Sequence, residues 1–284
     1  MKIEFTFFNK FVFYASYIYY KAASFVEVKS PRFNFFFFEL LYSVNKILRI
    51  PVKINKLFSI SYVETKFGKF HIRPGTEDII CASPAFERND LNRLISLIGK
   101  KANEKKRILF LDIGADFGSY SLTLGLWFKN YKNFDIFAFE PTDISFELLM
   151  RNIRENKLEK KIRTFNIALA EKNDNFKIYY DNERPGSSSI KTKKGKGIVV
   201  KGKTMDSLGI RYNSYDAIFV KIDVEGFEDN VIKGSKKLLE TEAELYLFIE
   251  DFKNTRFIKH LSQNIIFDTK ITPYNSWWRN KADI

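Results

Sequence analysis

Apolar and polar residues alternate in blocks along the chain from residue 107 onward, and each block has the length of one strand or one helix. Largely apolar runs are typical of strands buried on both faces of a parallel sheet, and they occupy 108–113, 134–139, 162–169, 217–223 and 245–250. Between them, apolar residues recur at helical spacing, as at Phe146, Leu149 and Ile153. This alternation predicts an α/β fold with a doubly wound sheet.

Three intervals depart from this alternation. Residues 61–73 alternate around Gly68, which predicts a hairpin, and helical spacing follows over 85–100 and, later in the chain, over 231–239. Residues 174–208 hold two strand-like pieces, 176–180 and 198–200, on either side of a segment rich in glycine, serine and lysine. We expect a β-hairpin inserted between the third and fourth strands, with the lysines of 191–203 in a solvated loop.

The chain therefore divides into an aromatic-rich N-terminal extension (1–60), a main domain (61–252) and a C-terminal segment (253–284). Within the main domain, 61–100 hold the first hairpin and helix, and 107–252 form a Rossmann-like core. The apolar runs 11–20 and 35–41 are too short for a transmembrane helix, which needs roughly 20 residues. We expect 1–60 to pack against the main domain; peripheral contact with a membrane surface is the alternative.

Composition bears on the cellular compartment of the protein and on the ligands that it could bind. Cys81 is the only cysteine, so no intrachain disulfide forms, and no secretory signal is recognisable; we expect a cytoplasmic protein. The formal net charge is +13, but the excess is spread over both parts of the chain rather than gathered in one basic arm. Two histidines and one cysteine leave little material for a zinc site, and we expect no metal.

A glycine-rich turn follows the first strand of the core. The strand delivers Asp112 to the carboxyl edge of the sheet, Gly114 permits a sharp turn, and Gly118 opens the next helix. The spacing is similar to the dinucleotide fingerprint, but Asp116 stands where that fingerprint needs its middle glycine. A carboxylate there repels a pyrophosphate, whereas it suits S-adenosylmethionine, which carries an ammonium and a sulfonium and no phosphate.

Acidic residues end two further strands at the same edge. Glu140 follows Gly118 by 22 residues, and a carboxylate in that place accepts the hydroxyls of a ribose. Pro141 then turns the chain into the next helix. Asp223 and Glu225 follow the fourth strand, where they would face the methionine end of the cofactor or the acceptor. The sequence thus predicts a class I S-adenosylmethionine-dependent methyltransferase.

Together these motifs resemble the FkbM family of methyltransferases over about residues 66–252. The family's motifs D-x-G-A-N-x-G, F-E-P and I-D-V-E-G are similar to residues 112–118, 139–141 and 222–226. Its G-x-S-S, T-L-D-S-L and R-x-G-T-x-D segments are similar to residues 186–189, 204–208 and 73–78. The departure inside the cofactor turn is Asp116 in place of asparagine, which is nearly isosteric and adds a charge.

The resemblance implies O-methylation of a hydroxyl on a sugar, a glycan or a secondary metabolite, with S-adenosylmethionine as cofactor. The residues we expect to bind the cofactor are Asp112, Gly114, Ala115, Asp116, Gly118, Glu140, Pro141, Ala168 and Asp223. A hydroxyl benefits from a general base, and we expect Asp223 and Glu225 to be the catalytic pair, with Glu250, Asp251 and His71 as other candidates. A magnesium site at Asp223 and Glu250 is the alternative use of these carboxylates.

Three other functions stay open. A nucleic-acid methyltransferase, above all one acting on RNA, suits the net charge of +13. However, base N-methylation sites usually carry an Asn/Asp-Pro-Pro-aromatic loop after the fourth strand, and residues 223–226 contain no proline. A catalytically inactive binding module on the same fold is the second, and a NAD-dependent enzyme, disfavoured by Asp116, is the third. We expect a small-molecule or glycan acceptor and no nucleic-acid partner.

Overall fold

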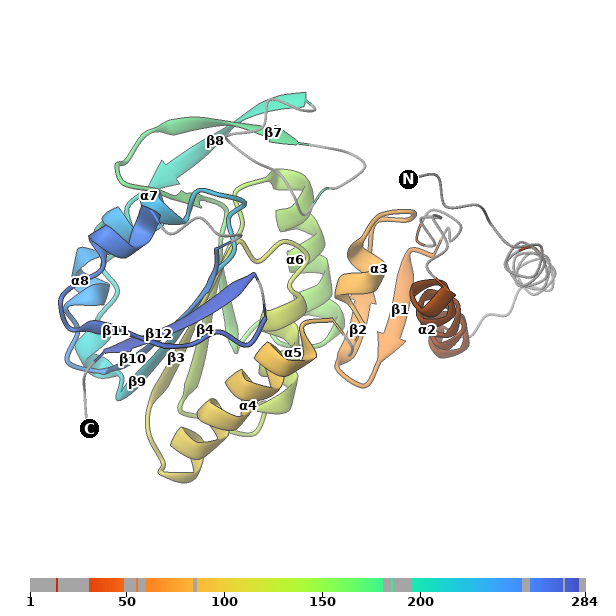
Figure 1. Cartoon of the computed structure of the whole chain (residues 1–284), viewed down its shortest axis with the longest axis horizontal. Helices are drawn as coiled ribbons and strands as arrows, with labels where there is room; N and C mark the ends of the chain where they lie inside the picture. Colours follow the sequence, from red (N-terminus) through yellow and green to blue (C-terminus); the bar gives the residue numbers. More distant parts are fainter. Residues whose placement is uncertain are drawn as a thin grey trace.

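The computed structural model shows an α/β molecule built on one large sheet (Figure 1). It describes residues 14, 31–48, 55, 60–83, 86–180, 185, 196–251, 256–272 and 274–280.

Seven strands form this sheet in the order β11-β12-β10-β9-β3-β4-β5. In chain order they are β3 (Ile108–Ile113), β4 (Phe134–Phe139), β5 (Ile162–Phe165), β9 (Ala217–Ile222), β10 (Glu244–Glu250), β11 (Ile265–Thr269) and β12 (Asn275–Asn280). The central strand β3 pairs in parallel with β4 and β9, while β12 is antiparallel to both of its neighbours.

Helices cover both faces of the sheet, as the apolar runs predict. In β3, Ile108 and Phe110 face a core that includes α4 (Arg88–Asn103), α5 (Ser119–Trp127) and α6 (Asp143–Glu155). Leu109, Leu111 and Ile113 face a second core with α7 (Glu228–Lys233) and α8 (Lys236–Leu239). Figure 1 shows the two helix groups on opposite sides of the sheet. The doubly wound α/β architecture predicted from the sequence is confirmed.

Several element bounds differ from the sequence prediction. The apolar stretch 162–169 is two strands, because the chain leaves the large sheet after β5, and β6 (Ala168–Leu169) pairs instead with β8. The helical stretch 231–239 is likewise broken into α7 and α8 at Gly234 and Ser235. Residues after 252, set apart in the sequence analysis, supply the 3₁₀-helix η5 (Arg256–His260), β11 and β12, so the sheet extends beyond that boundary.

The predicted hairpin at 61–73 is present as β1 (Tyr62–Thr65) and β2 (Gly68–His71) and leads into the short helix α3 (Asp78–Cys81). One edge of β2 is held by two asparagines of α6: Asn152 exchanges hydrogen bonds with the backbone of His71, and Asn156 with that of Lys69. Helix α2 (Pro31–Leu48) packs beside β1 (Figure 1) and buries Phe38. This described part of the N-terminal extension therefore contacts the main domain.

The inserted hairpin also forms, from β7 (Asn175–Tyr180) and β8 (Lys196–Lys203), between β5 and β9 in the chain. Lys201 and Lys203 therefore lie in a strand rather than in the expected loop, because β8 pairs with β7 along its length and with β6 near its end. Lys191, Lys193 and Lys194 lie outside the described residues. The 3₁₀-helices η3 (Met205–Leu208) and η4 (Tyr212–Ser214) then connect β8 to β9.

Among the helices that the structure describes, none combines the length and the apolar character needed to cross a membrane.

Candidate functional site

A cavity of about 1080 Å³ lies at the carboxyl edge of the parallel strands. Its floor is made by the residues that follow β3, β4 and β9 and by the end of β10. Its other walls include residues of α2, of the segment 77–87 and of β6, together with Ile178, Thr272 and Tyr274. Cavities that hold small ligands typically measure about 300–1,000 Å³, so this one has room for a cofactor and part of an acceptor.

Gly114 lets the ends of two strands meet below the cavity. Its φ is +83°, and a Cβ there would lie 1.8 Å from the carbonyl oxygen of Asp223. The N–H of Asp223 donates to the carbonyl of Ile113 (3.0 Å), which fixes the same approach. Any larger residue at position 114 would therefore push the β9 end, with Asp223 and Glu225, away from the β3 turn.

Gly118 serves helix packing rather than the cavity wall. It is the N-cap of α5 with a φ of +95°, and it is not among the residues that line the cavity. A Cβ there would meet Leu122 at 2.3 Å and Leu149 at 2.6 Å. Its place between α5 and α6 explains the glycine without any contact to a ligand.

Asp112 organises the start of α5. Its buried Oδ2 accepts hydrogen bonds from the backbone N–H of Ser121 (3.1 Å) and from the hydroxyl of Ser121 (2.6 Å). Burial raises the pKa of Asp112, although the nearby ammonium of Lys221 opposes the shift. Asp112 also lines the cavity, so it supports the turn of α5 and contributes a wall.

Asp116 is ion-paired within the protein. Arg73 Nη2 lies 2.7 Å from its Oδ1 and 2.6 Å from its Oδ2. Arg73 Nε also donates to Asp78 Oδ2 (2.7 Å), and its Nη1 donates to the hydroxyl of Ser145 (2.9 Å). Burial lowers the pKa of Arg73, but Asp116 and Asp78 outweigh it and leave that pKa raised, so the guanidinium stays charged. Asp116 therefore shares one positive charge with Asp78 before any ligand binds.

Glu140 lies at the end of β4 and faces the cavity while nearly fully buried. Its Oε1 accepts from the N–H (2.9 Å) and the hydroxyl (2.7 Å) of Thr142, and its Oε2 accepts from the N–H of Asp116 (3.0 Å). Burial, and then the charge of Asp116, raise the pKa of Glu140 to about 7. Its carboxylate is thus held in one orientation.

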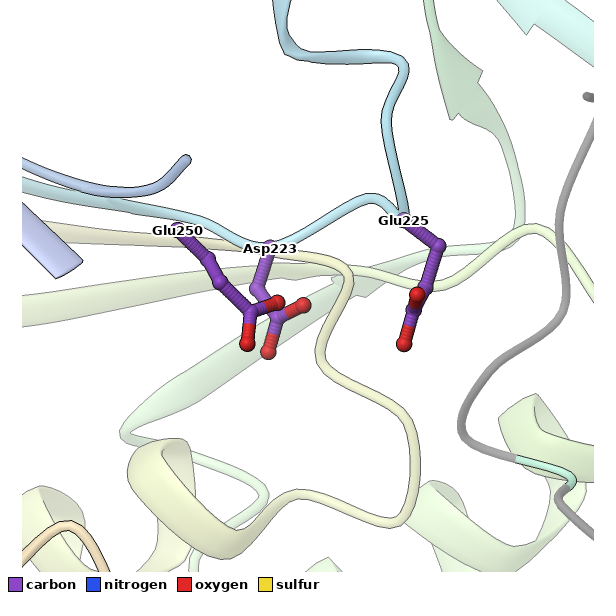
Figure 2. Close-up of side chains that lie close together, drawn as sticks. All are labelled: Asp223, Glu225 and Glu250. Atoms are coloured by element: carbon purple, nitrogen blue, oxygen red, sulfur yellow. The ribbon is translucent and has the colours of Figure 1, made fainter. Parts of the chain in front are cut away.

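Three carboxylates converge where β9 and β10 end (Figure 2). Asp223, Glu225 and Glu250 each offer an oxygen, and these oxygens lie within 4.8 Å of one another. The buried Lys221 reaches Asp223 from β9, with Nζ 2.6 Å from Oδ2. Burial opposes ionisation of Asp223, but Lys221 and a hydrogen bond with Glu250 lower its pKa. Burial and the charge of Asp223 raise the pKa of Glu250 to about 11, so Glu250 holds a proton at neutral pH.

Left-handed backbone marks the same cavity. Among the described residues, five non-glycine residues have a positive φ, and three of them, Glu87, Asp116 and Glu225, line the cavity. The φ of Glu225 is +51°, and its carboxylate lies on the same side of the strand ends as those of Asp223 and Glu250 (Figure 2). Such residues cost conformational energy and cluster at functional sites.

The remaining predicted residues divide into two groups. Ala115, Pro141 and Ala168 line the cavity. Two of the other candidate bases do not: the ring of His71 points to Glu155, with Nε2 3.6 Å from its carboxylate, and Asp251 pairs with Lys270 at 2.8 Å. Glu250, the third of those candidates, lines the cavity with Asp223 and Glu225.

Sequence reasoning missed Arg73, Lys221 and Glu87 as parts of the site. Lys221 had a signal, because it is a lone charge inside an otherwise apolar strand. Glu87 accepts a hydrogen bond from the hydroxyl of Tyr120 (2.7 Å) and one from the side chain of Asn275 (3.0 Å). These partners lie 33 and 188 residues away in the sequence, so only the fold brings them together.

No curated protein matches the chain. Solved structures with a similar fold include TrmN from Thermus thermophilus, with 12% identity and a TM-score of 0.41, covering 75% of this chain and 54% of that one. The N-terminal domain of human METTL16 in complex with SAH has 14% identity and a TM-score of 0.40, covering 68% of each chain. Precorrin-6y C5,15-methyltransferase from Geobacter metallireducens GS-15 has 14% identity and a TM-score of 0.34, covering 60% of this chain and 77% of that one.

The family model of the methyltransferase FkbM domain matches residues 112–266. The matched part begins at Asp112, contains the turns after β3, β4 and β9, and ends in β11. It includes more than half of the chain. The chain therefore belongs to the FkbM family of S-adenosylmethionine-dependent methyltransferases.

Proposed function

We propose that this protein transfers the methyl group of S-adenosylmethionine to a hydroxyl of a sugar, a glycan or a secondary metabolite. The observation that carries the proposal is the meeting of the family's glycine turn with Asp223 and Glu225 in one cavity. The turn and Asp223 serve the cofactor, and Glu225 serves the transfer.

The residues present fit this cofactor. S-adenosylmethionine carries a sulfonium, an ammonium and a carboxylate, and the described cavity lining is rich in carboxylates. Glu140 is held by Thr142 and Asp116 in a fixed orientation, and we assign it to the ribose hydroxyls. Ser119 and Tyr120, in the first turn of α5, line the cavity where a helix N-terminus favours the cofactor's carboxylate. We assign Asp223 to its ammonium.

In this reaction the protein mainly has to align the acceptor oxygen with the methyl group. When bound, the cofactor supplies a methyl group on a positively charged sulfur, which an acceptor oxygen attacks in line. The O–CH₃ bond forms as the S–CH₃ bond breaks, and the acceptor loses its hydroxyl proton. We assign Glu225 to orient that hydroxyl and to take its proton, because Glu225 adjoins Asp223 without contacting Lys221 in the described structure.

An RNA or DNA acceptor is less well supported than a small molecule or glycan. The net charge of the whole chain is +13, which attracts nucleic acid in general. The described cavity lining, in contrast, has many carboxylates, and these repel a phosphate backbone close to the reacting methyl.

The test is incubation of the full chain with methyl-labelled S-adenosylmethionine and fractionated cell extract. We expect label in a small-molecule or glycan fraction, as a methyl ether that survives mild alkali. Ribonuclease treatment of the extract should leave the label unchanged. The Glu140→Ala chain is the control: loss of one charged hydrogen bond should weaken cofactor binding by about 1.5–3 kcal/mol. Label found only in RNA, or only on nitrogen, would contradict the proposal.

A further inference from the structure

Helix α2 has apolar side chains on two opposite faces. On one face, Phe38 and Leu41 are buried and belong to the core that includes α4, α5 and α6. Near its start, Arg32 forms an ion pair with Glu64 of β1, beside which the helix lies (Figure 1). These contacts fix the helix on the main domain and determine which face points away from it.

The outward face carries a second apolar stripe. Phe36, Leu40 and Ile47 are 63%, 48% and 78% exposed, and Ser43, between Leu40 and Ile47, is exposed as well. Steps of four, three and four residues place these side chains in one row along a helix. The other exposed large apolar side chains of the described residues come from separate elements, so they gather only on α2. Grouped exposed apolar side chains of this kind mark a contact surface.

The sequence around this stripe is basic. Both parts of the chain carry an excess of positive charge, but residues 1–60 contain nine lysines and arginines and three glutamates, a net charge of +6 in about a fifth of the length. From residue 41 to residue 63 the sequence has four basic residues and no acidic one: Lys46, Arg49, Lys53 and Lys56. Helices that lie in the surface of an anionic membrane combine an apolar stripe with such a positive charge.

We propose that the outward face of α2 binds the surface of an anionic lipid bilayer. The helix lies parallel to the bilayer surface, and Phe36, Leu40 and Ile47 enter the boundary between head groups and acyl chains. The net positive charge of residues 1–60 attracts the lipid phosphates. The buried face, with Phe38 and Leu41, keeps the main domain attached to the same helix.

This contact lies beside the cavity. Ser43 belongs to the outward stripe and also lines the cavity, together with Phe38, Glu39 and Tyr42 of the same helix. Membrane binding through α2 would therefore place one rim of the cavity next to the lipid head groups. A methyl acceptor carried by a lipid would reach that rim without leaving the bilayer, although membrane binding itself does not depend on which acceptor is methylated.

A second copy of this chain is the competing partner for the stripe. Two-fold pairing through α2 would bring together two segments that each carry a net charge of +6, and these charges repel. Stable protein interfaces bury about 1,200–2,000 Å², of which three side chains on one helix supply only a small part. An anionic bilayer, in contrast, matches both the apolar stripe and the charge.

Co-sedimentation of the full chain with lipid vesicles tests the proposal. We expect the chain to sediment with vesicles made of equal parts phosphatidylglycerol and phosphatidylcholine, and to bind vesicles of phosphatidylcholine alone about tenfold less strongly. Potassium chloride at about 1 M should weaken binding to the anionic vesicles several-fold, because salt screens the attraction between charges. A chain that does not sediment with the anionic vesicles would overturn the proposal.

A triple variant tests the stripe itself. Replacing Phe36, Leu40 and Ile47 by glutamine removes the apolar row and keeps a good helix former at each position. The partition coefficient of this variant on anionic vesicles should fall about tenfold or more. The matched control removes three exposed apolar side chains from three other elements: Ile144→Gln, Val199→Gln and Phe267→Gln. We expect the control to bind the vesicles like the unaltered chain.

Three results with these variants would overturn the proposal. Equal vesicle binding of the two triple variants would show that α2 is not the contact. A dimer in analytical ultracentrifugation that only the α2 variant dissociates would assign the stripe to a second copy of the chain. A clearly larger loss of stability to urea in the α2 variant than in the control would show that another segment of this chain covers the stripe.

Discussion

Arg73 and Asp116, 43 residues apart in the sequence, form an ion pair in which Nη2 of the arginine reaches both carboxylate oxygens, at 2.7 and 2.6 Å. The same guanidinium binds Asp78 and the hydroxyl of Ser145 at the start of α6. Because the N–H of Asp116 in turn donates to Glu140 (3.0 Å), Arg73 is linked through one residue to the carboxylate assigned to the ribose. Three segments of the chain are thus joined at the cofactor turn.

Arg73→Ala should lower the free energy of unfolding by about 3–5 kcal/mol, because it leaves the buried Asp78 and the partly buried Asp116 without their cation. Urea unfolding followed by circular dichroism measures this. Asp116→Asn is the comparison: it restores the family's residue, tolerates the left-handed φ of +46° and leaves Arg73 paired with Asp78. It should cost about 1 kcal/mol or less. Equal losses of unfolding free energy in the two variants would show that Arg73 stabilises the fold only through its pair with Asp116.

Cofactor affinity should rise with pH through neutrality. The pKa of Glu140 is raised to about 7, first by burial and then by the charge of Asp116, so the folded protein keeps this proton below pH 7. Only the ionised form accepts hydrogen bonds from both ribose hydroxyls. From pH 6 to pH 8 the ionised fraction grows about tenfold, and the Kd for S-adenosylmethionine should fall by a similar factor.

Isothermal titration across this range provides the measurement, and Glu140→Gln is its control. The variant binds the same cofactor, whose own amine titrates identically, so only the contribution of Glu140 disappears. We expect weaker binding in Glu140→Gln with a flatter pH dependence. Parallel pH profiles for the two proteins would assign the titration to another group.

The sequence predicted most of the sheet because buried parallel strands leave an unmistakable pattern. In β3, every residue from Ile108 to Ile113 is buried, and the unbroken apolar run predicted this. The break between β5 and β6 was not predicted, since Asn166 interrupts an otherwise apolar stretch only weakly. Strands β11 and β12 were missed for another reason. Trp277 stacks on Phe248 and donates a hydrogen bond to Asp90, and both of these partners lie far away in the sequence.

The residues of the candidate site also divide into those that the sequence could predict and those that it could not. Residues at strand ends, such as Asp112, Glu140 and Asp223, could be located from the sequence because parallel strands bring their carboxyl ends to one edge. Glu250 was also named from the sequence as a possible partner of Asp223, and the order of β9 and β10 in the sheet brings the two side chains together. The contribution of Arg73 depends on how the first hairpin packs against α6, which does not follow from local pattern.

Lys221→Met should destabilise the protein by about 3–5 kcal/mol, since it leaves the buried Asp112 and the partly buried Asp223 without the cation beside them. Burial lowers the pKa of Lys221, but these carboxylates outweigh it and leave that pKa raised, so its charge is present throughout the working range. Lys132→Met, at an exposed position, is the matched control and should change the free energy of unfolding by less than about 0.5 kcal/mol. If both variants unfold at the same urea concentration, the buried pair contributes nothing to stability.

The last prediction separates the two carboxylates that follow β9. Asp223→Asn removes the charge assigned to the cofactor's ammonium, so it should mainly raise the Kd for S-adenosylmethionine. Glu225→Gln keeps the size and the left-handed backbone of the residue (φ +51°) but cannot accept a proton. It should leave that Kd nearly unchanged and lower kcat by about 10²–10⁴, the usual contribution of a general base. Titration and single-turnover methyl transfer on the same preparations measure both quantities.

The assignment of Asp223 to the cofactor and of Glu225 to the transfer holds only if the two variants lose different properties. Asp223 shares its surroundings with Lys221, at 2.6 Å, so its replacement also leaves a buried ammonium, and a loss of stability is expected beside the loss of affinity. Glu225→Gln leaves the ion pair of Lys221 and Asp223 in place, so its loss of stability should be the smaller of the two. If Glu225→Gln keeps full turnover, Glu225 only shapes the turn into α7, and the proton must pass to Glu250 or Asp223. Glu250 already holds a proton at neutral pH, so that outcome would leave Asp223 as the base.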